Sequence, residues 1–214
     1  MKKLLITILL MQAPVSVWAA GSGLPLLDVD LAHDKATLKQ GAEFALSVCT
    51  GCHSFKYIKY RDLLAIGFSE QEVDGLRGDQ ELTASIVSLS PADMMVDSYG
   101  LVPPDLSIIA KARKGGGRYV YTLFNSFYVR DDGNVDNHLF PGIRMPDVLG
   151  VASLDGEAKK DTQESLKKVA SFLEWASDPN GEERRSLGVY VLVYLFIFTF
   201  MLWLMKRRVW ADVH

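Results

Sequence analysis

The chain has few cysteines: its 214 residues include only Cys49 and Cys52. A structural zinc site needs four ligands, so these two thiols would have to recruit two more. The histidines outside the Cys-x-x-Cys-His run are His33, His138 and His214, and no ligand spacing relates them. We therefore do not expect a zinc site.

The sequence also lacks an excess of positive charge. Lysine and arginine number 23 against 26 acidic residues, which gives a net charge of −3 spread along the chain. This balance argues against a nucleic-acid partner and is compatible with a basic protein partner. The chain has no internal repeat and no second Cys-x-x-Cys-His run.

The five residues Cys49-Thr50-Gly51-Cys52-His53 carry the main chemical signal. On a short helical turn, two cysteines three positions apart project to one side, where each can form a thioether with a haem vinyl group. The histidine that follows can then bind the iron from one face. A thioredoxin-like redox pair would instead lie between a strand and a helix, whereas this run follows a helix-like segment. The motif predicts one covalent haem c.

The N-terminus reads as a secretory signal, residues 1–19. Lys2 and Lys3 precede an apolar stretch, and Val17-Trp18-Ala19 is a small-residue cleavage site, so the mature chain is expected near Ala20. An uncleaved anchor is the alternative, but the stretch is short and Pro14 interrupts it. Export agrees with the motif, because haem is attached to cysteines outside the bacterial cytoplasm.

Residues 187–205 form the longest uncharged apolar run. At about 1.5 Å per residue, a helix of this length nearly matches the roughly 30 Å hydrocarbon core of a bilayer. Lys206, Arg207 and Arg208 follow directly, and the positive-inside rule places residues 206–214 in the cytoplasm as a short tail. Residues 20–186 would then be a periplasmic domain, held by one span to the bacterial inner membrane.

The intervening domain reads as mostly α. Apolar residues at helical spacing predict helices over about 31–48, 103–114, 118–128 and 161–175. No segment alternates convincingly as a strand. Two long stretches rich in Gly, Pro, Asp and Asn, 67–98 and 130–154, are expected to be loops that wrap the haem.

The second axial ligand should come from one of these loops. The candidates are Met94, Met95, Met145, His33 and His138. Met145 is favoured because it stands in a proline-bounded loop, residues 140–149, whose stiff flanks could hold a thioether against iron. A methionine can also be a core gap-filler, and Met94 with Met95 is the alternative ligand source.

Several segments together resemble cytochrome c1 of the ubiquinol–cytochrome c reductase (bc1) complex. They are the haem motif with Tyr57–Leu63, Pro103-Pro104-Asp105-Leu106-Ser107, Lys111–Gly116, Phe140-Pro141-Gly142 with Met145-Pro146, and the C-terminal anchor. The resemblance covers nearly all of the mature chain in the right order. It implies a class I cytochrome c-like haem domain with long loops and one C-terminal transmembrane helix.

The resemblance also implies residue roles. The Pro104 carbonyl would accept the N–H of His53 and fix its ring, and Arg113 and Tyr119 match positions that contact the haem propionates. The methionine loop departs from the family pattern, because only Ile143 and Arg144 separate Gly142 from Met145.

The function implied is electron transfer within a dimeric complex, from the Rieske iron–sulfur protein to a soluble cytochrome c, beside cytochrome b. The chain would do no bond chemistry of its own. Three alternatives stay open: a free-standing anchored monohaem cytochrome, a haem enzyme or gas sensor with an open iron position, and a non-haem thiol–disulfide protein. Two acidic clusters, Glu70–Glu81 and Asp131–Asp136, either steer a basic acceptor or are simply solvated.

Overall fold

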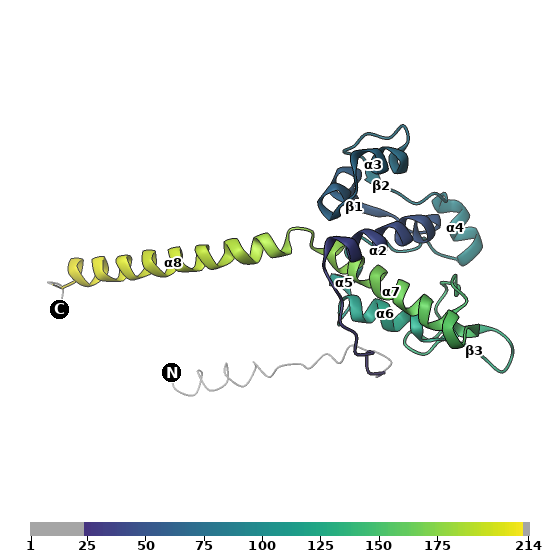
Figure 1. The fold of residues 1–214 in the computed structure, drawn as a ribbon. Helices are drawn as coiled ribbons and strands as arrows, with labels where there is room; N and C mark the ends of the chain where they lie inside the picture. Colours follow the sequence, from purple (N-terminus) through teal and green to yellow (C-terminus); the bar gives the residue numbers. More distant parts are fainter. Residues whose placement is uncertain (1–23, 212–214) are drawn as a thin grey trace, which may run out of the picture.

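The computed structural model describes residues 24–211. Helices dominate it (Figure 1), and the expected mostly α class is confirmed. The expected signal segment 1–19 and the cleavage point near Ala20 lie outside the described residues. The helices are α2 (Lys35–Val48), α3 (Glu70–Arg77), α4 (Ala92–Tyr99), α5 (Ile109–Ala112), α6 (Gly117–Asn125), α7 (Gly156–Ser177) and α8 (Gly181–Val209), with short 3-10 turns at Cys49–Gly51, Tyr60–Ile66 and Val151–Ser153.

The core lies where α2 crosses α7, near the centre of the domain in Figure 1. Leu38, Ala42 and Ala45 of α2 are buried against an apolar face of α7 that includes Val169 and Phe172. Gly41 lets the two helices approach closely, because a Cβ there would lie 2.1 Å from the carbonyl oxygen of Lys168. This crossing fixes the end of α2, which leads directly into Cys49.

Helix α2 begins where its sequence provides a cap. The Asp34 carboxylate accepts from the backbone N–H of Thr37 at 3.0 Å, which satisfies one of the N–H groups that a helix start leaves without a partner. The helix was expected from residue 31, and it begins instead at Lys35 after this cap. Its other end coincides with the expected one.

Two small antiparallel sheets were not expected. Strand β1 (Phe55–Lys59) pairs with β2 (Ser85–Ile86), and β3 (Phe127–Val129) pairs with β4 (Val135–Asn137). The register of β1 is irregular, so its buried residues Phe55 and Ile58 are three apart rather than two. Apolar and polar residues therefore do not alternate along β1, and the sequence does not show the period of a strand.

The segment 67–98 is not a continuous loop, because it contains α3 and α4. Each is a short helix with one buried side chain, Val73 in α3 and Met95 in α4. The expected helix 103–114 shrinks to α5, and the expected helix 118–128 ends at Asn125 because Phe127 already pairs in β3. The expected helix 161–175 is longer, as α7.

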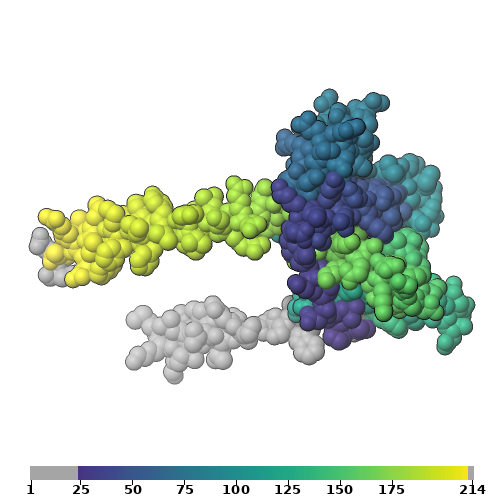
Figure 2. All heavy atoms as spheres, viewed as in Figure 1, coloured from purple at the N-terminus to yellow at the C-terminus, as the bar shows by residue number. Residues whose placement is uncertain are grey.

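Helix α8 extends away from the rest of the domain as a single rod (Figures 1 and 2). It is long and apolar enough to cross a membrane, and its side chains from Glu182 onward are almost all exposed. It contains the whole expected span 187–205 and begins one to two turns earlier, at Gly181. The helix is compatible with single-pass membrane anchoring.

Candidate haem-binding site

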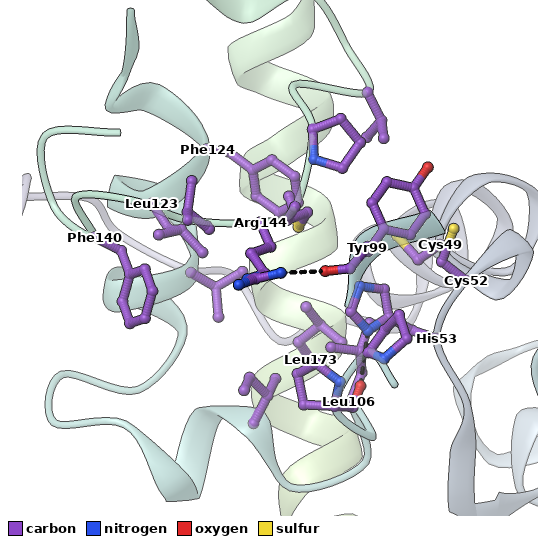
Figure 3. A pocket seen from close by; sticks show the side chains of 18 of the residues that line it. Cys49, Cys52, His53, Tyr99, Leu106, Leu123, Phe124, Phe140, Arg144 and Leu173 are labelled. Carbon is purple, nitrogen blue, oxygen red and sulfur yellow. Dashed lines mark hydrogen bonds between the residues drawn. The ribbon is translucent and has the colours of Figure 1, made fainter. Parts of the chain in front are cut away.

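A cavity of about 260 Å³ opens beside the Cys49–His53 turn (Figure 3). Apolar side chains line almost all of it. Together with Cys49, Cys52, His53, Arg113, Tyr119, Arg144 and Met145, the lining consists of Val48, Tyr99, Leu101, Pro103, Pro104, Leu106, Ile109, Val120, Leu123, Phe124, Phe140, Ile143, Pro146, Val148 and Leu173. All seven site residues expected from the sequence are therefore brought to one cavity.

The turn that carries the two cysteines is shaped by its own backbone. The amides of Cys52 and His53 both donate to the Cys49 carbonyl, at 3.1 and 2.8 Å, so α2 continues as one tight turn. A segment from further along the chain also binds this turn, since Leu89 N–H donates to the Thr50 carbonyl at 2.8 Å and the Ser90 hydroxyl to the Gly51 carbonyl at 2.6 Å. Both thiols and the imidazole line the same cavity.

The imidazole of His53 is fixed by one hydrogen bond, 2.7 Å from Nδ1 to the Pro104 carbonyl oxygen. A carbonyl can only accept, so Nδ1 carries the proton and Nε2 keeps its lone pair. Burial lowers the pKa of His53, while the Pro104 carbonyl and the Asp105 charge oppose that shift. The ring is thus neutral, oriented and able to bind a metal through Nε2.

The segment Pro103–Ser107 positions that carbonyl by binding the strand after the motif. Asp105 accepts from Lys56 N–H at 2.9 Å, the buried Ser107 hydroxyl accepts from Tyr57 N–H at 3.0 Å, and Leu106 N–H donates to the Ser54 carbonyl at 2.8 Å. These bonds engage the Pro104 carbonyl, the Leu106 amide and the side chains of Asp105 and Ser107 around the site. They explain why the expected helix starts only at Ile109.

Cys49 does not have the electrostatics of a redox-active thiol. Burial, with a smaller effect of neighbouring Cys52, raises the pKa of Cys49 to about 11. A thiol–disulfide enzyme needs the opposite, a lowered pKa that provides a thiolate at neutral pH. Both cysteines are free, as attachment of a prosthetic group requires.

Met145 is the one candidate for a second axial ligand, within residues 24–211, that lines this cavity. Met95 is buried in α4 and Met94 is exposed on it, and neither reaches the cavity. The two candidate histidines are engaged elsewhere. His33 lies 3.3 Å from the Glu174 carboxylate, and His138 stacks on Tyr128 with ring centroids 3.7 Å apart.

Two arginines border the cavity. Arg113 lies over the Tyr119 ring, 6.0 Å from its centroid. Arg144 precedes Met145 and donates from Nη1 to the Tyr99 carbonyl at 3.0 Å, as the dashed line in Figure 3 shows. The sequence did not indicate Tyr99, nor that Leu123 and Phe124 would form an apolar wall with Phe140 of the methionine loop, because only the tertiary fold assembles them.

The acidic clusters are partly engaged in local structure. Glu72 lies 2.7 Å from the Lys39 ammonium and Asp74 lies 2.7 Å from the Arg77 guanidinium. Asp136 accepts from the backbone amides of Asn137 and Gly142, and these bonds lower its pKa. These carboxylates shape helix α3 and the start of the methionine loop.

The donor set fits a c-type haem. An apolar cavity suits the porphyrin, two thiols and a neutral imidazole share one wall, a thioether lies on the lining, and a guanidinium can balance propionate charge. Bound there, such a group would supply a one-electron couple. The protein groups would set its potential through the axial ligands and the low-dielectric wall.

Comparison with known proteins agrees with this chemistry. The Cytochrome C1 family model matches residues 28–213. The chain is 30% identical to cytochrome c1 of Allochromatium vinosum over the full length of both chains, and 30% identical to cytochrome c1 of Rhodospirillum rubrum over 85% of this chain and 83% of the relative. It is also 28% identical, over 85% of its length, to 34% of a Bradyrhizobium diazoefficiens protein named cytochrome b/c1.

The resemblance drawn from the motifs is thus confirmed, together with the haem cofactor and the electron-transfer role of this family. The match extends from the N-terminal side of α2 to the end of α8, so it covers the cavity and the apolar helix alike. The chain belongs to the cytochrome c1 family.

Proposed function

We propose that the chain is the haem c subunit of a cytochrome bc1 complex, accepting one electron from a Rieske iron–sulfur protein and delivering it to a soluble cytochrome c. The observation that carries the proposal is the convergence of Cys49, Cys52, His53 and Met145 on one cavity of a cytochrome c1 family member. Cys49 and Cys52 would hold the haem through thioethers, and His53 and Met145 would bind its iron.

The chain's own residues perform three tasks in this role. The Pro104 carbonyl holds the His53 ring by its Nδ1–H, so Nε2 keeps a fixed direction toward the cavity. The apolar wall lowers the local dielectric and would disfavour extra positive charge on a bound haem. Arg113, whose guanidinium lies over the Tyr119 ring, would balance the charge of the propionates.

A cytochrome b partner is supported by the Bradyrhizobium relative, whose name, cytochrome b/c1, joins the two. Helix α8 supports a membrane location beside such a partner, and Lys206, Arg207 and Arg208 at its end favour a periplasmic haem domain by the positive-inside rule. We infer the division 1–19 signal, 20–186 haem domain, 187–205 span and 206–214 tail. A dimeric complex follows from the family resemblance.

Purification from detergent-solubilised membranes tests the proposal. Affinity-tagged chain should copurify with a cytochrome b and a Rieske protein, and quinol should reduce its haem. The denatured polypeptide should keep a covalent haem stain. Chain that carries haem but purifies alone would favour the free-standing monohaem cytochrome instead, and chain without covalent haem would overturn the cofactor assignment at Cys49 and Cys52.

A further inference from the structure

The methionine loop, residues 140–149, is held firmly at both ends. At its start, the Asn137 amide oxygen accepts from Leu139 N–H at 2.9 Å and from Phe140 N–H at 3.0 Å, and Asp136 accepts from Gly142 N–H at 2.8 Å. At its end, the Asp147 carboxylate accepts from Ala152 N–H at 2.7 Å. These contacts bracket Met145 without touching the residues beside it.

The centre of the loop is joined to another part of the chain by Arg144. Its Nη1 donates to the Tyr99 carbonyl at 3.0 Å, across 45 positions of sequence. Tyr99 is the last residue of α4, where a helix leaves carbonyls without an intrahelical partner and carries partial negative charge. A guanidinium is well suited to such a site, because its charge and its N–H groups both match a terminal carbonyl.

Gly100 makes this approach possible. It caps α4 in the left-handed conformation, with φ +74°, and a Cβ there would lie 2.3 Å from Arg144 Nη1. The guanidinium therefore packs directly on backbone that carries no side chain. Helix α4 follows the segment of Leu89 and Ser90 that binds the Cys49–His53 turn. The Arg144–Tyr99 contact therefore joins the methionine loop to the side of the cavity that carries this turn.

We propose that Arg144 is a positioning residue for the iron ligand: its bond to the Tyr99 carbonyl latches the centre of the methionine loop to the wall that carries the haem-attachment turn. The inference rests on the proposed role of Met145 as axial ligand. The sequence departs from the family pattern by a short loop with an arginine beside the methionine. The latch gives this arginine a structural role. Without the latch, Met145 would leave the iron more often.

The test compares Arg144→Leu with Arg61→Leu in the full-length protein in detergent. Leucine keeps an apolar side chain at residue 144 but has neither a donor nor a sulfur that could bind iron, and Arg61 is an exposed arginine that does not line the cavity. Hydrogen exchange of the 140–149 amides, carbon monoxide binding to ferrous haem and the reduction potential are measured. Arg144→Leu should raise exchange and carbon monoxide binding by about three- to tenfold, the range expected for losing one such hydrogen bond, and should lower the potential. Arg144→Lys, which keeps the charge with a less extended donor group, should lie between.

A second pair of variants tests the latch without altering Arg144. Gly100→Ala puts a methyl group against the guanidinium, whereas Gly67→Ala places alanine at another left-handed helix cap, φ +98°, where the nearest atom is at 3.7 Å. Gly100→Ala should exceed Gly67→Ala in loop exchange and carbon monoxide binding. Equal values within each pair would overturn the latch. A wild-type chain without covalent haem would overturn the proposed function instead, and the exchange measurement would still decide the latch.

Discussion

Met145 is the proposed second axial ligand, and a thioether opposite an imidazole would raise the potential of a bound haem and close its iron to other ligands. Met145→Ala should open the sixth position, allow carbon monoxide to bind ferrous haem, and lower the potential by on the order of 0.1 V or more. Visible absorption and a redox titration measure these changes.

Met94 and Met95 provide the control for that substitution, since both lie on α4 and neither lines the cavity. Met95→Ala removes a buried side chain and should reduce stability by roughly 2–5 kcal/mol while leaving the haem spectrum unchanged. If Met94→Ala or Met95→Ala opened the iron and Met145→Ala did not, the ligand would have to be reassigned to α4.

Asp178 gives a prediction for pH. It lies between the Lys111 ammonium, at 3.1 Å, and the Arg184 guanidinium, and the hydrogen bonds from Arg184 are the main cause that lowers its pKa from 3.8 to about 2. A carboxyl with a lowered folded-state pKa stabilises the fold fully above its unfolded value and loses that contribution as the pH falls through the folded one. Wild type should therefore melt above Asp178→Asn at pH 5–6, and the two melting temperatures should converge between pH 4 and 2. A difference that stays constant over this range would contradict the assignment.

The residues predictable from the sequence were those whose chemistry is local. Cys49, Cys52 and His53 are fixed by spacing on one turn, and Met145 is marked by the prolines around its loop. Pro104, Arg113 and Tyr119 came from the resemblance alone. Tyr99 was not predictable, because its contribution is a backbone carbonyl at a helix end that meets Arg144 only after folding.

At the scale of elements, the crossing of α2 and α7 is the packing step that presents the haem turn. Gly41→Ala would place a Cβ 2.1 Å from the Lys168 carbonyl oxygen, so the helices would have to separate. We expect a loss of about 1–3 kcal/mol in the free energy of unfolding, the usual cost of overpacking. Thermal and urea unfolding measure it.

The matched control is Gly75→Ala in α3, where a Cβ meets nothing within 4 Å. Alanine is the better helix former by roughly 1 kcal/mol, so this variant should be neutral or slightly more stable. Opposite signs at the two glycines would identify the helix crossing as the cause. A similar loss at both would point to a general effect of replacing helical glycine.

Long helices with a wide apolar face were the elements that periodicity could find. Helix α7 has eight buried positions, whereas α3 and α4 have one each, too few to show a period. Helix α3 did carry a readable start signal, because Ser69 and Glu72 form a capping box. The two-stranded sheets are short, and the irregular register of β1 hides the alternation that would have marked it.

At the scale of the whole molecule, the composition of α8 was readable because a bilayer demands length and apolarity all round, which no tertiary contact has to supply. The cavity was not readable in this way, since its wall is drawn from α4, α5, α6, α7 and the methionine loop. Asp178, directly after α7, connects α8 with the rest of the domain, because it pairs with Arg184 in the first turns of α8 and with Lys111 of α5.

This arrangement predicts that the haem domain folds without its anchor if the cut preserves that contact. A chain ending after residue 186 keeps the Arg184–Asp178 pair and loses the exposed apolar part of α8 with the basic residues that follow it. It should be water-soluble, carry covalent haem, and have the absorption spectrum and potential of the full-length protein. Full-length chain should stay with the membrane fraction after a high-salt wash, because its apolar helix and not surface charge would hold it there. A cut chain that is exported but loses haem would mean that α8 is needed to complete the haem domain. Full-length chain released by salt would contradict anchoring by α8.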